Sequence, residues 1–202
     1  MFIAIAINSV LYLVPNHVVV QPPVELPWTR LDSAVPFIPW TLWVYFSDYL
    51  LVGSAFLQSR TWGEVRRFAR AYFALLVTGA LVHLAWPTAF PRESYPVVGD
   101  TFTAQAFMLF RQIDLPTSCM PSMHVAGSFL AAFSLWRQRP PLPAIFTAWA
   151  CAVAVSTLTV KQHYAVDVGG GLVMATLFWA IFFWWPEARA HQRSGNTLAS
   201  TS

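Results

Sequence analysis

The stretch that decides the fold runs from Leu142 to Trp185 and reads LPAIFTAWACAVAVSTLTV, KQHYAVD, VGGGLVMATLFWAIFFWW. The first run, Leu142–Val160, and the third, Val168–Trp185, contain no charged residue. A helix needs about 20 mainly apolar residues to cross the hydrocarbon core of a bilayer. Two runs of nearly this length, separated by a short polar segment, therefore predict two membrane-spanning helices joined by a turn.

The composition of the whole chain also indicates an integral membrane protein. Of its 202 residues, 56% are hydrophobic and only 10% are charged, whereas soluble domains carry roughly 25% charged residues. Aromatic residues reach 16%, which excludes intrinsic disorder. The net charge of +3 comes without any run rich in Lys and Arg, so we expect no nucleic-acid partner. Two cysteines, Cys119 and Cys151, are too few for a disulfide or zinc framework.

Six apolar stretches are candidates for membrane-spanning helices. They are Phe2–Val20, Ile38–Leu57, Phe68–Trp86, Pro121–Trp136, Leu142–Val160 and Val168–Trp185. The first is the weakest, because Asn8 and the Pro15-Asn16-His17 sequence interrupt it, and we expect a retained span rather than a signal peptide. The predicted fold class is an all-α polytopic membrane protein with six transmembrane helices. We expect a single domain over residues 1–202, with a flexible polar tail at about 187–202.

The distribution of cationic residues predicts the orientation of these spans. Eight of the 12 Lys and Arg residues lie in the linkers after the second and fourth spans and in the tail: Arg60, Arg66, Arg67, Arg70, Arg137, Arg139, Arg189 and Arg193. Because cytoplasmic loops carry an excess of positive charge, we expect this side to be cytoplasmic. The predicted location is a bacterial inner membrane, with the polar clusters described next on the periplasmic or extracytoplasmic side.

One polar cluster lies between the last two spans and contains Lys161, His163 and Asp167. His163 and Asp167 are four residues apart, so on a helix their side chains share one face. A carboxylate bonded to one imidazole nitrogen fixes the tautomer and leaves the other nitrogen free as a nucleophile. The alternative is a solvated loop whose carboxylate caps the following helix.

A second polar cluster, with Pro121, Ser122 and His124, begins the fourth span. Pro121 suits the first turn of a helix, and the free N–H groups of a helix N-terminus attract phosphate. His124 would lie one turn in, in position to give a proton to a leaving oxygen; alone, it could equally be a hydrogen-bonded interior histidine. A third cluster, which ends in Arg92, follows the third span on the same predicted face.

The two histidine motifs together resemble those of the type 2 phosphatidic acid phosphatase superfamily. Pro121–His124 reads PSMH and is similar to the Pro-Ser-Gly-His motif of that superfamily. A second superfamily motif reads Ser-Arg, five residues, His, three residues and Asp. The chain has the same spacing, with Ser156 and Thr157 followed by five residues, His163, three residues and Asp167. The shared spacing and the shared membrane face make the resemblance specific.

The departures from the superfamily pattern point to one branch. Met123 stands in place of the usual glycine, Thr157 in place of the usual arginine, and the Lys-(six residues)-Arg-Pro motif is absent. The stretches around Arg92 and Lys161 instead look like the branch of inositol phosphorylceramide synthases. The resemblance implies that cations at these two positions bind phosphate.

The resemblance implies phosphoryl transfer through a histidine. His163 would attack phosphorus and become phosphohistidine, and Asp167 would stabilise its imidazolium. His124 would protonate the departing alkoxide and then act as a base on the incoming water or alcohol. The residues expected to hold the non-bridging phosphate oxygens are Ser122, Arg92 and Lys161.

The expected substrate is a lipid phosphate within the bilayer, and we expect no metal and no cofactor, because the cations can neutralise the phosphate. Two acceptors of the phosphoryl group in the second step stay open. Water would be the acceptor in a phosphatase, and a lipid hydroxyl would be the acceptor in a transferase of the inositol phosphorylceramide synthase type that serves sphingolipid metabolism. Three further alternatives are a proton-coupled or ion transporter, a metal site formed by two His and one Asp, and an inactive scaffold.

Four other features of the sequence are weaker candidates for the site. Asp48 is the sole acid inside the second predicted span and was kept outside the site, although buried acids in membranes are commonly functional. His83 could line the cavity, and Arg111 and Asp114 were expected to form a local salt bridge. The Gly169–Gly171 run lacks the pattern of a nucleotide-binding loop, so we expect close helix packing there.

Overall fold

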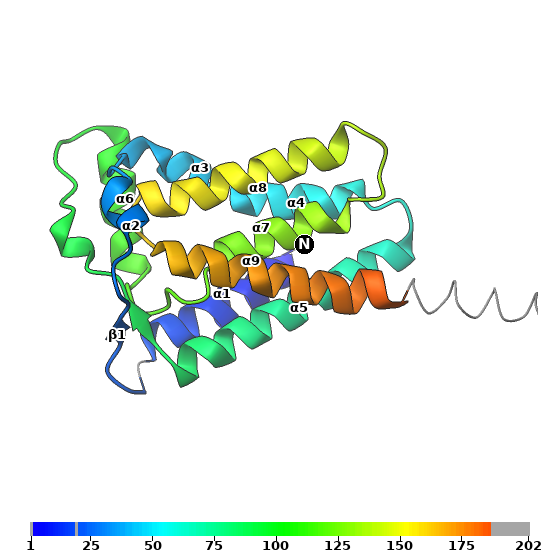
Figure 1. The fold of residues 1–202 in the computed structure, drawn as a ribbon, viewed down its shortest axis with the longest axis horizontal. Coiled ribbons are helices and arrows are strands. Elements are labelled where there is room, and N and C mark those ends of the chain that lie inside the picture. The colour runs from blue at the N-terminus through cyan, green and yellow to red at the C-terminus, as the bar shows by residue number, and fades with distance from the viewer. Residues whose placement is uncertain (1, 19, 187–202) are drawn as a thin grey trace, which may run out of the picture.

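A computed structural model describes residues 2–18 and 20–186 of the chain, which fold mostly into helices arranged along one long axis (Figure 1). The helices of the bundle are α1 (Phe2–His17), α4 (Asp48–Gln58), α5 (Trp62–Ala85), α7 (Met123–Ser134), α8 (Leu142–Thr159) and α9 (Ala165–Trp179), which continues as a π-helical turn at Ala180–Trp184. The shorter helices are α2 (Arg30–Ala34), α3 (Leu42–Phe46) and α6 (Phe102–Ile113), with 3₁₀ turns at Pro39–Thr41 and Arg92–Ser94. The predicted flexible tail lies outside the described residues.

Three helices are long and apolar enough to cross a membrane: Trp62–Ala85, Leu142–Thr159 and Ala165–Trp184. The last two occupy the apolar runs that decide the fold. The second predicted span divides at Ser47 into α3 and α4, and the fourth forms only the 12-residue helix α7. The structure therefore confirms a mostly helical protein with helices of membrane-spanning length, while a total of six crossings stays a prediction.

Helix α7 lies at the centre of the bundle, and its small residues explain why. It packs against α9, α8, α4 and α5, and every residue from His124 to Ala132 is buried. Ala126, Gly127 and Ala131 lack the bulk that would hold neighbouring helices apart, and small residues let helix backbones approach closely in membranes. The start of α7 is thereby fixed against several neighbours at once.

The glycine run on α9 provides the closest of these approaches. A Cβ atom at Gly171 would lie 2.5 Å from the backbone oxygen of Ser122, and one at Gly170 would lie 2.6 Å from the Cε atom of Met120. A Cβ atom at Gly169 would meet nothing within 4 Å. The prediction of close helix packing is therefore confirmed at Gly170 and Gly171 and wrong at Gly169.

Short elements cover the end of the bundle where α5 ends and α7 and α9 begin, which is on the left in Figure 1. Here β1 (Val24–Glu25) pairs in parallel with β2 (Thr88–Ala89), a short pairing that the sequence did not predict in this mostly helical protein. Prolines at positions 22, 23 and 27 and at 87 and 91 flank the two segments. Because proline removes a helix hydrogen bond and biases its neighbour toward extended backbone, both segments stay out of helices.

Candidate active site

His163 and Asp167 meet at the start of α9, as their spacing predicts. Nδ1 of His163 lies 3.4 Å from Oδ2 of Asp167, and both side chains are buried. The same carboxylate oxygen accepts a hydrogen bond of 2.8 Å from the backbone N–H of Tyr164. The sequence left two roles open for Asp167, as a partner of His163 or as a cap of the following helix. Asp167 has both roles, because it caps α9 and holds one ring nitrogen of His163. This leaves Nε2 of His163 as the nitrogen available for chemistry.

His124, the second residue of α7, lies next to this pair. The ring centroids of His124 and His163 are 6.3 Å apart. The hydroxyl group of Tyr45 lies 3.1 Å from Nδ1 of His124, and Oδ2 of Asp48 lies 4.0 Å from its Nε2. The sequence leaves Asp48 outside the predicted site and gives Tyr45 no role in it. The signal that could have found Asp48 was its being the sole acid in a predicted span.

Ser122 joins the two histidine motifs. Its backbone N–H donates to the backbone oxygen of Asp167 at 3.1 Å, and its side chain is fully buried. Among the described residues, none forms a hydrogen bond with the Ser122 hydroxyl. His83, which was expected to line the cavity, is buried with Nε2 3.1 Å from the backbone oxygen of Pro121. His83 thus supports the turn that precedes Ser122.

Arg92 forms a buried ion pair with Asp114, which the sequence predicted to pair with Arg111. Its Nη2 donates to Oδ2 of Asp114 at 2.9 Å. Burial has the largest single effect on the pKa of Arg92 and would lower it, but Asp114 and the weaker effects of Cys119, Tyr12 and Tyr45 together raise that pKa. The expected salt bridge between Arg111 and Asp114 is therefore wrong. Arg111 instead donates to the backbone oxygen of Tyr95 and lies 4.8 Å from the ring centroid of Phe107.

Helix α1 completes the surroundings of this ion pair. The hydroxyl group of Tyr12 donates to Oδ1 of Asp114 at 2.6 Å, and the Tyr12 ring lies 6.1 Å from the ring of His124, edge to face. The side-chain amide of Asn16 donates to the backbone oxygen of Leu115 at 2.6 Å. The polar residue that weakened the first predicted span thus fastens α1 to the loop that carries Asp114.

Lys161 lies in the turn between α8 and α9 with a left-handed backbone, φ 55°. Its ammonium group donates to the backbone oxygens of Asp32 at 3.0 Å and Val35 at 2.6 Å. Burial lowers the pKa of Lys161. Lys161 and His163 line the same narrow depression, together with Asp32, Val35, Phe90 and Leu158, and it has no room for a water molecule in this conformation. The ammonium group of Lys161 also lies 5.0 Å from the ring centroid of Tyr95.

Cys119 lies among the catalytic candidates, although the sequence analysis gave it no role. Its sulfur atom and one ligand atom each of His163 and Asp167 all lie within 4.8 Å of one another. Thiolate, imidazole and carboxylate are ligands that zinc accepts. However, burial raises the pKa of the Cys119 thiol, with a further rise from Asp167. The thiol is therefore held in its protonated form, which is the weaker metal ligand.

Comparison with known proteins identifies the family. Over 77 residues, 35% are identical to an uncharacterized protein of Methanocaldococcus jannaschii, an alignment that covers 38% of this chain and 30% of that relative. The chain thus matches less than a third of the length of this relative. A family model described as the PAP2 superfamily matches residues 24–181, which include both histidines and every element that surrounds them except α1. The chain belongs to the PAP2 superfamily.

Proposed function

We propose that this protein is a membrane-embedded lipid phosphate phosphatase or phosphotransferase that forms a phosphohistidine at His163. Membership of the PAP2 superfamily indicates phosphatase or phosphotransferase activity, and the three apolar helices indicate a membrane protein. One observation carries the assignment of roles. His163 has one ring nitrogen held by Asp167, and a second histidine, His124, lies 6.3 Å away between ring centroids.

The reaction proceeds in two balanced steps. In the first, Nε2 of His163 attacks phosphorus, the ester P–O bond breaks, and His124 gives its proton to the leaving alkoxide. Asp167 stabilises the positive charge on the His163 ring. In the second, His124 takes a proton from water or a lipid hydroxyl, whose oxygen attacks phosphorus while the P–N bond breaks. Inorganic phosphate or a new phospholipid leaves, and both histidines return to their starting states.

The proposed phosphate ligands are Ser122, Arg92 and Lys161. The Ser122 hydroxyl group forms no hydrogen bond with any described residue and is buried beside Asp167, so a phosphate oxygen would give it a partner. The free N–H groups at the start of α7 would add to this attraction. Arg92 and Lys161 are held by Asp114 and by backbone oxygens. These contacts fix both cations in place before substrate arrives, which strengthens charge stabilisation in the transition state.

A metal-dependent phosphoesterase is the second candidate, because Cys119 lies with His163 and Asp167 at a spacing that suits metal ligands. In that case His163 would be a ligand and could not also be the nucleophile. Arg92 and Lys161, the cations close to these residues, favour a phosphate anion over a metal cation at this place.

We further propose that the chain crosses a bacterial inner membrane six times, with the histidines at the extracytoplasmic end. Eight cations in the linkers and the tail favour a cytoplasmic location for the opposite end. The segments over the histidine end expose Trp28 and Trp40, and tryptophan is typical of the interface between membrane and water.

The proposed activity can be tested by incubating purified protein with a panel of phospholipids, with and without ceramide or diacylglycerol. Release of inorganic phosphate is expected for a phosphatase, and formation of a new phospholipid is expected for a transferase, including one of the inositol phosphorylceramide synthase type. The His163→Ala variant should form neither product. If no lipid phosphate is converted by the wild-type protein under any condition, the proposal is wrong.

A further inference from the structure

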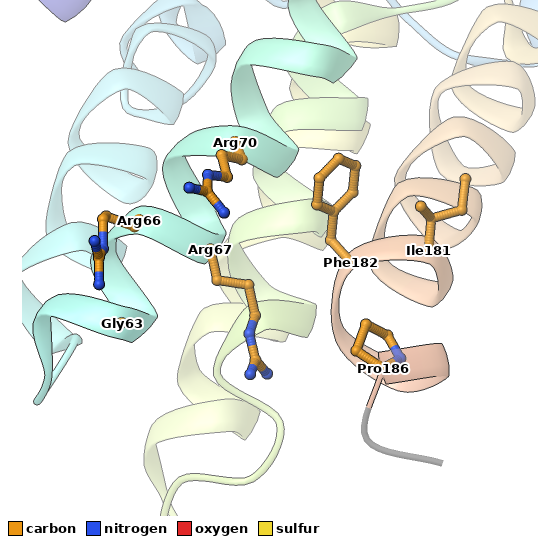
Figure 2. Close-up of a pocket in the computed structure, with 7 residues that line it drawn as sticks. All are labelled: Gly63, Arg66, Arg67, Arg70, Ile181, Phe182 and Pro186. Atoms are coloured by element: carbon orange, nitrogen blue, oxygen red, sulfur yellow. The ribbon is translucent and has the colours of Figure 1, made fainter. Parts of the chain in front are cut away.

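A second cationic site lies at the end of the bundle opposite to the histidines. A cavity of about 450 Å³ lies between the start of α5 and the end of the C-terminal helix, and its lining residues are Gly63, Arg66, Arg67, Arg70, Ile181, Phe182 and Pro186 (Figure 2). The three arginines come from one helix, and Ile181, Phe182 and Pro186 come from the other, with Phe182 on the side nearer to the arginines (Figure 2). Helix α5 has 24 residues, so its two ends lie roughly 36 Å apart, about the thickness of a bilayer.

Two of the cations that line this cavity are close enough along the helix to repel each other. Arg66 and Arg70 are four residues apart on α5, so they share a face, and like charges at this spacing repel each other. Among the described lining residues none is acidic. The nearby carboxylate of Glu64 accepts a hydrogen bond from the backbone N–H of Arg60.

The cavity also has an apolar side that suits an acyl chain. Ile181 is 55% exposed, and Phe182 is half-buried beside it. The guanidinium of Arg67 lies 5.8 Å from the ring centroid of Phe183, an arrangement in which the ring fixes the position of the cation. Cations and exposed apolar side chains therefore meet at the same place, whereas a site for free phosphate would need no apolar side.

We propose that this cavity binds the phosphate headgroup of an anionic phospholipid in the leaflet opposite to the active site, with Arg66 and Arg70 as its main ligands and the acyl chain along Ile181 and Phe182. Arginine binds phosphate in a planar, two-pronged geometry, and basic pockets beside membrane helices bind acidic lipid headgroups. This inference rests on the membrane location but not on the proposed reaction, because no residue of the cavity lies among the proposed catalytic residues.

The test is lipid-dependent thermal unfolding of the full chain in detergent, titrated with phosphatidylglycerol, phosphatidylcholine or inorganic phosphate. Phosphatidylglycerol should raise the unfolding midpoint at concentrations at which the other two have no effect. The double variant Arg66→Gln and Arg70→Gln, whose side chains are exposed, should bind phosphatidylglycerol about tenfold more weakly. Native mass spectrometry of the same samples counts the lipids that stay bound.

Arg139→Gln is the matched control, since it removes an exposed cation from the same end of the bundle but not from the cavity. It should bind phosphatidylglycerol within twofold of the wild type. Equal binding of phosphatidylcholine, equal stabilisation by inorganic phosphate, an unchanged double variant, or an equal loss in Arg139→Gln would each overturn the proposal. Because the readout is unfolding and lipid retention, it stays valid even if no phosphoryl transfer is found.

Discussion

His124 is contacted by two side chains from the second predicted span, and this arrangement matters for its role as an acid. In the proposed reaction, His124 gives a proton to the leaving alkoxide, and the carboxyl group of Asp48 lies 4.0 Å from Nε2 of its ring. The hydroxyl group of Tyr45 at Nδ1 fixes the ring orientation. Asp48 is thus a positioning residue, which acts on the reaction through His124.

Replacing Asp48 by Asn should slow turnover of natural lipid phosphates by roughly tenfold to hundredfold, a part of the about 10²- to 10⁴-fold that general acid catalysis supplies. With a nitrophenyl phosphate ester, whose leaving group needs no proton, the loss should be less than threefold. The measurement is kcat for both substrates, with Asp100→Asn, an exposed acid in a loop, as the control. Equal losses with both substrates would contradict the role in leaving-group protonation.

The Cys119 thiol distinguishes the two proposed chemistries. The phosphohistidine reaction does not use the thiol, so Cys119→Ser should keep activity within about threefold, and treatment with EDTA should not reduce it. In a metal site that includes Cys119, loss of one ligand should abolish most activity. Activity that EDTA removes and zinc restores would show that the metal-independent reaction is wrong.

Contacts between residues close together in the sequence could be predicted, whereas contacts between distant residues could not. His163 lies in the bend just before α9, and Asp167 lies in the first turn of α9. The four-residue spacing therefore predicted the contact correctly, although a bend and not a helical turn brings the two side chains together. Tyr45 on α3 and Asp48 on α4 reach His124 from 79 and 76 residues away, and these contacts depend on how both helices lie against α7. Asp114 could have paired with Arg111 or Arg92, and the nearer residue in sequence was the wrong choice.

At the scale of elements, the approach of α9 to the start of α7 positions the site. A methyl group at Gly171 would collide with the backbone of Ser122, which cannot move as a flexible side chain could. We expect Gly171→Ala to lower the stability by about 1–3 kcal/mol and to reduce activity, because Ser122 and His124 are displaced together.

Gly169→Ala is the control for this prediction, since nothing lies within 4 Å of its added Cβ atom. Alanine favours helix more than glycine does, so this variant should be as stable as the wild type or slightly more stable. Thermal unfolding in detergent and initial rates check both variants. A Gly171→Ala variant that matches Gly169→Ala in both measurements would show that the close approach has no consequence.

The elements also show where apolar patterning is insufficient. Hydropathy located the two runs at Leu142–Val160 and Val168–Trp185 because each is a single long helix. It did not detect the break at Ser47, because a short interruption in an apolar run leaves mean hydropathy unchanged. The two-residue strands were also missed, since strand pairing depends on a distant partner.

For the whole molecule, the orientation in the membrane can be tested by cysteine labelling. Val98 is 86% exposed near the histidine end, and Arg139 is exposed at the other end. With Cys119 and Cys151 replaced by serine, an impermeant maleimide should label Val98→Cys from outside intact bacterial spheroplasts and should spare Arg139→Cys. Permeabilised membranes should allow labelling of both. The reverse pattern in intact spheroplasts would contradict the proposed orientation.

The central claim is that phosphate passes through His163, and trapping of the phosphoenzyme tests it most directly. Wild-type protein and the variants His163→Ala, His124→Ala and Asp167→Asn would be quenched during turnover of a labelled natural lipid phosphate and a labelled nitrophenyl ester. We predict an acid-labile phosphoenzyme in the wild type, none in His163→Ala, and retention in His124→Ala with the activated ester, with slow formation in Asp167→Asn. Phosphate trapped on His163→Ala would contradict the account.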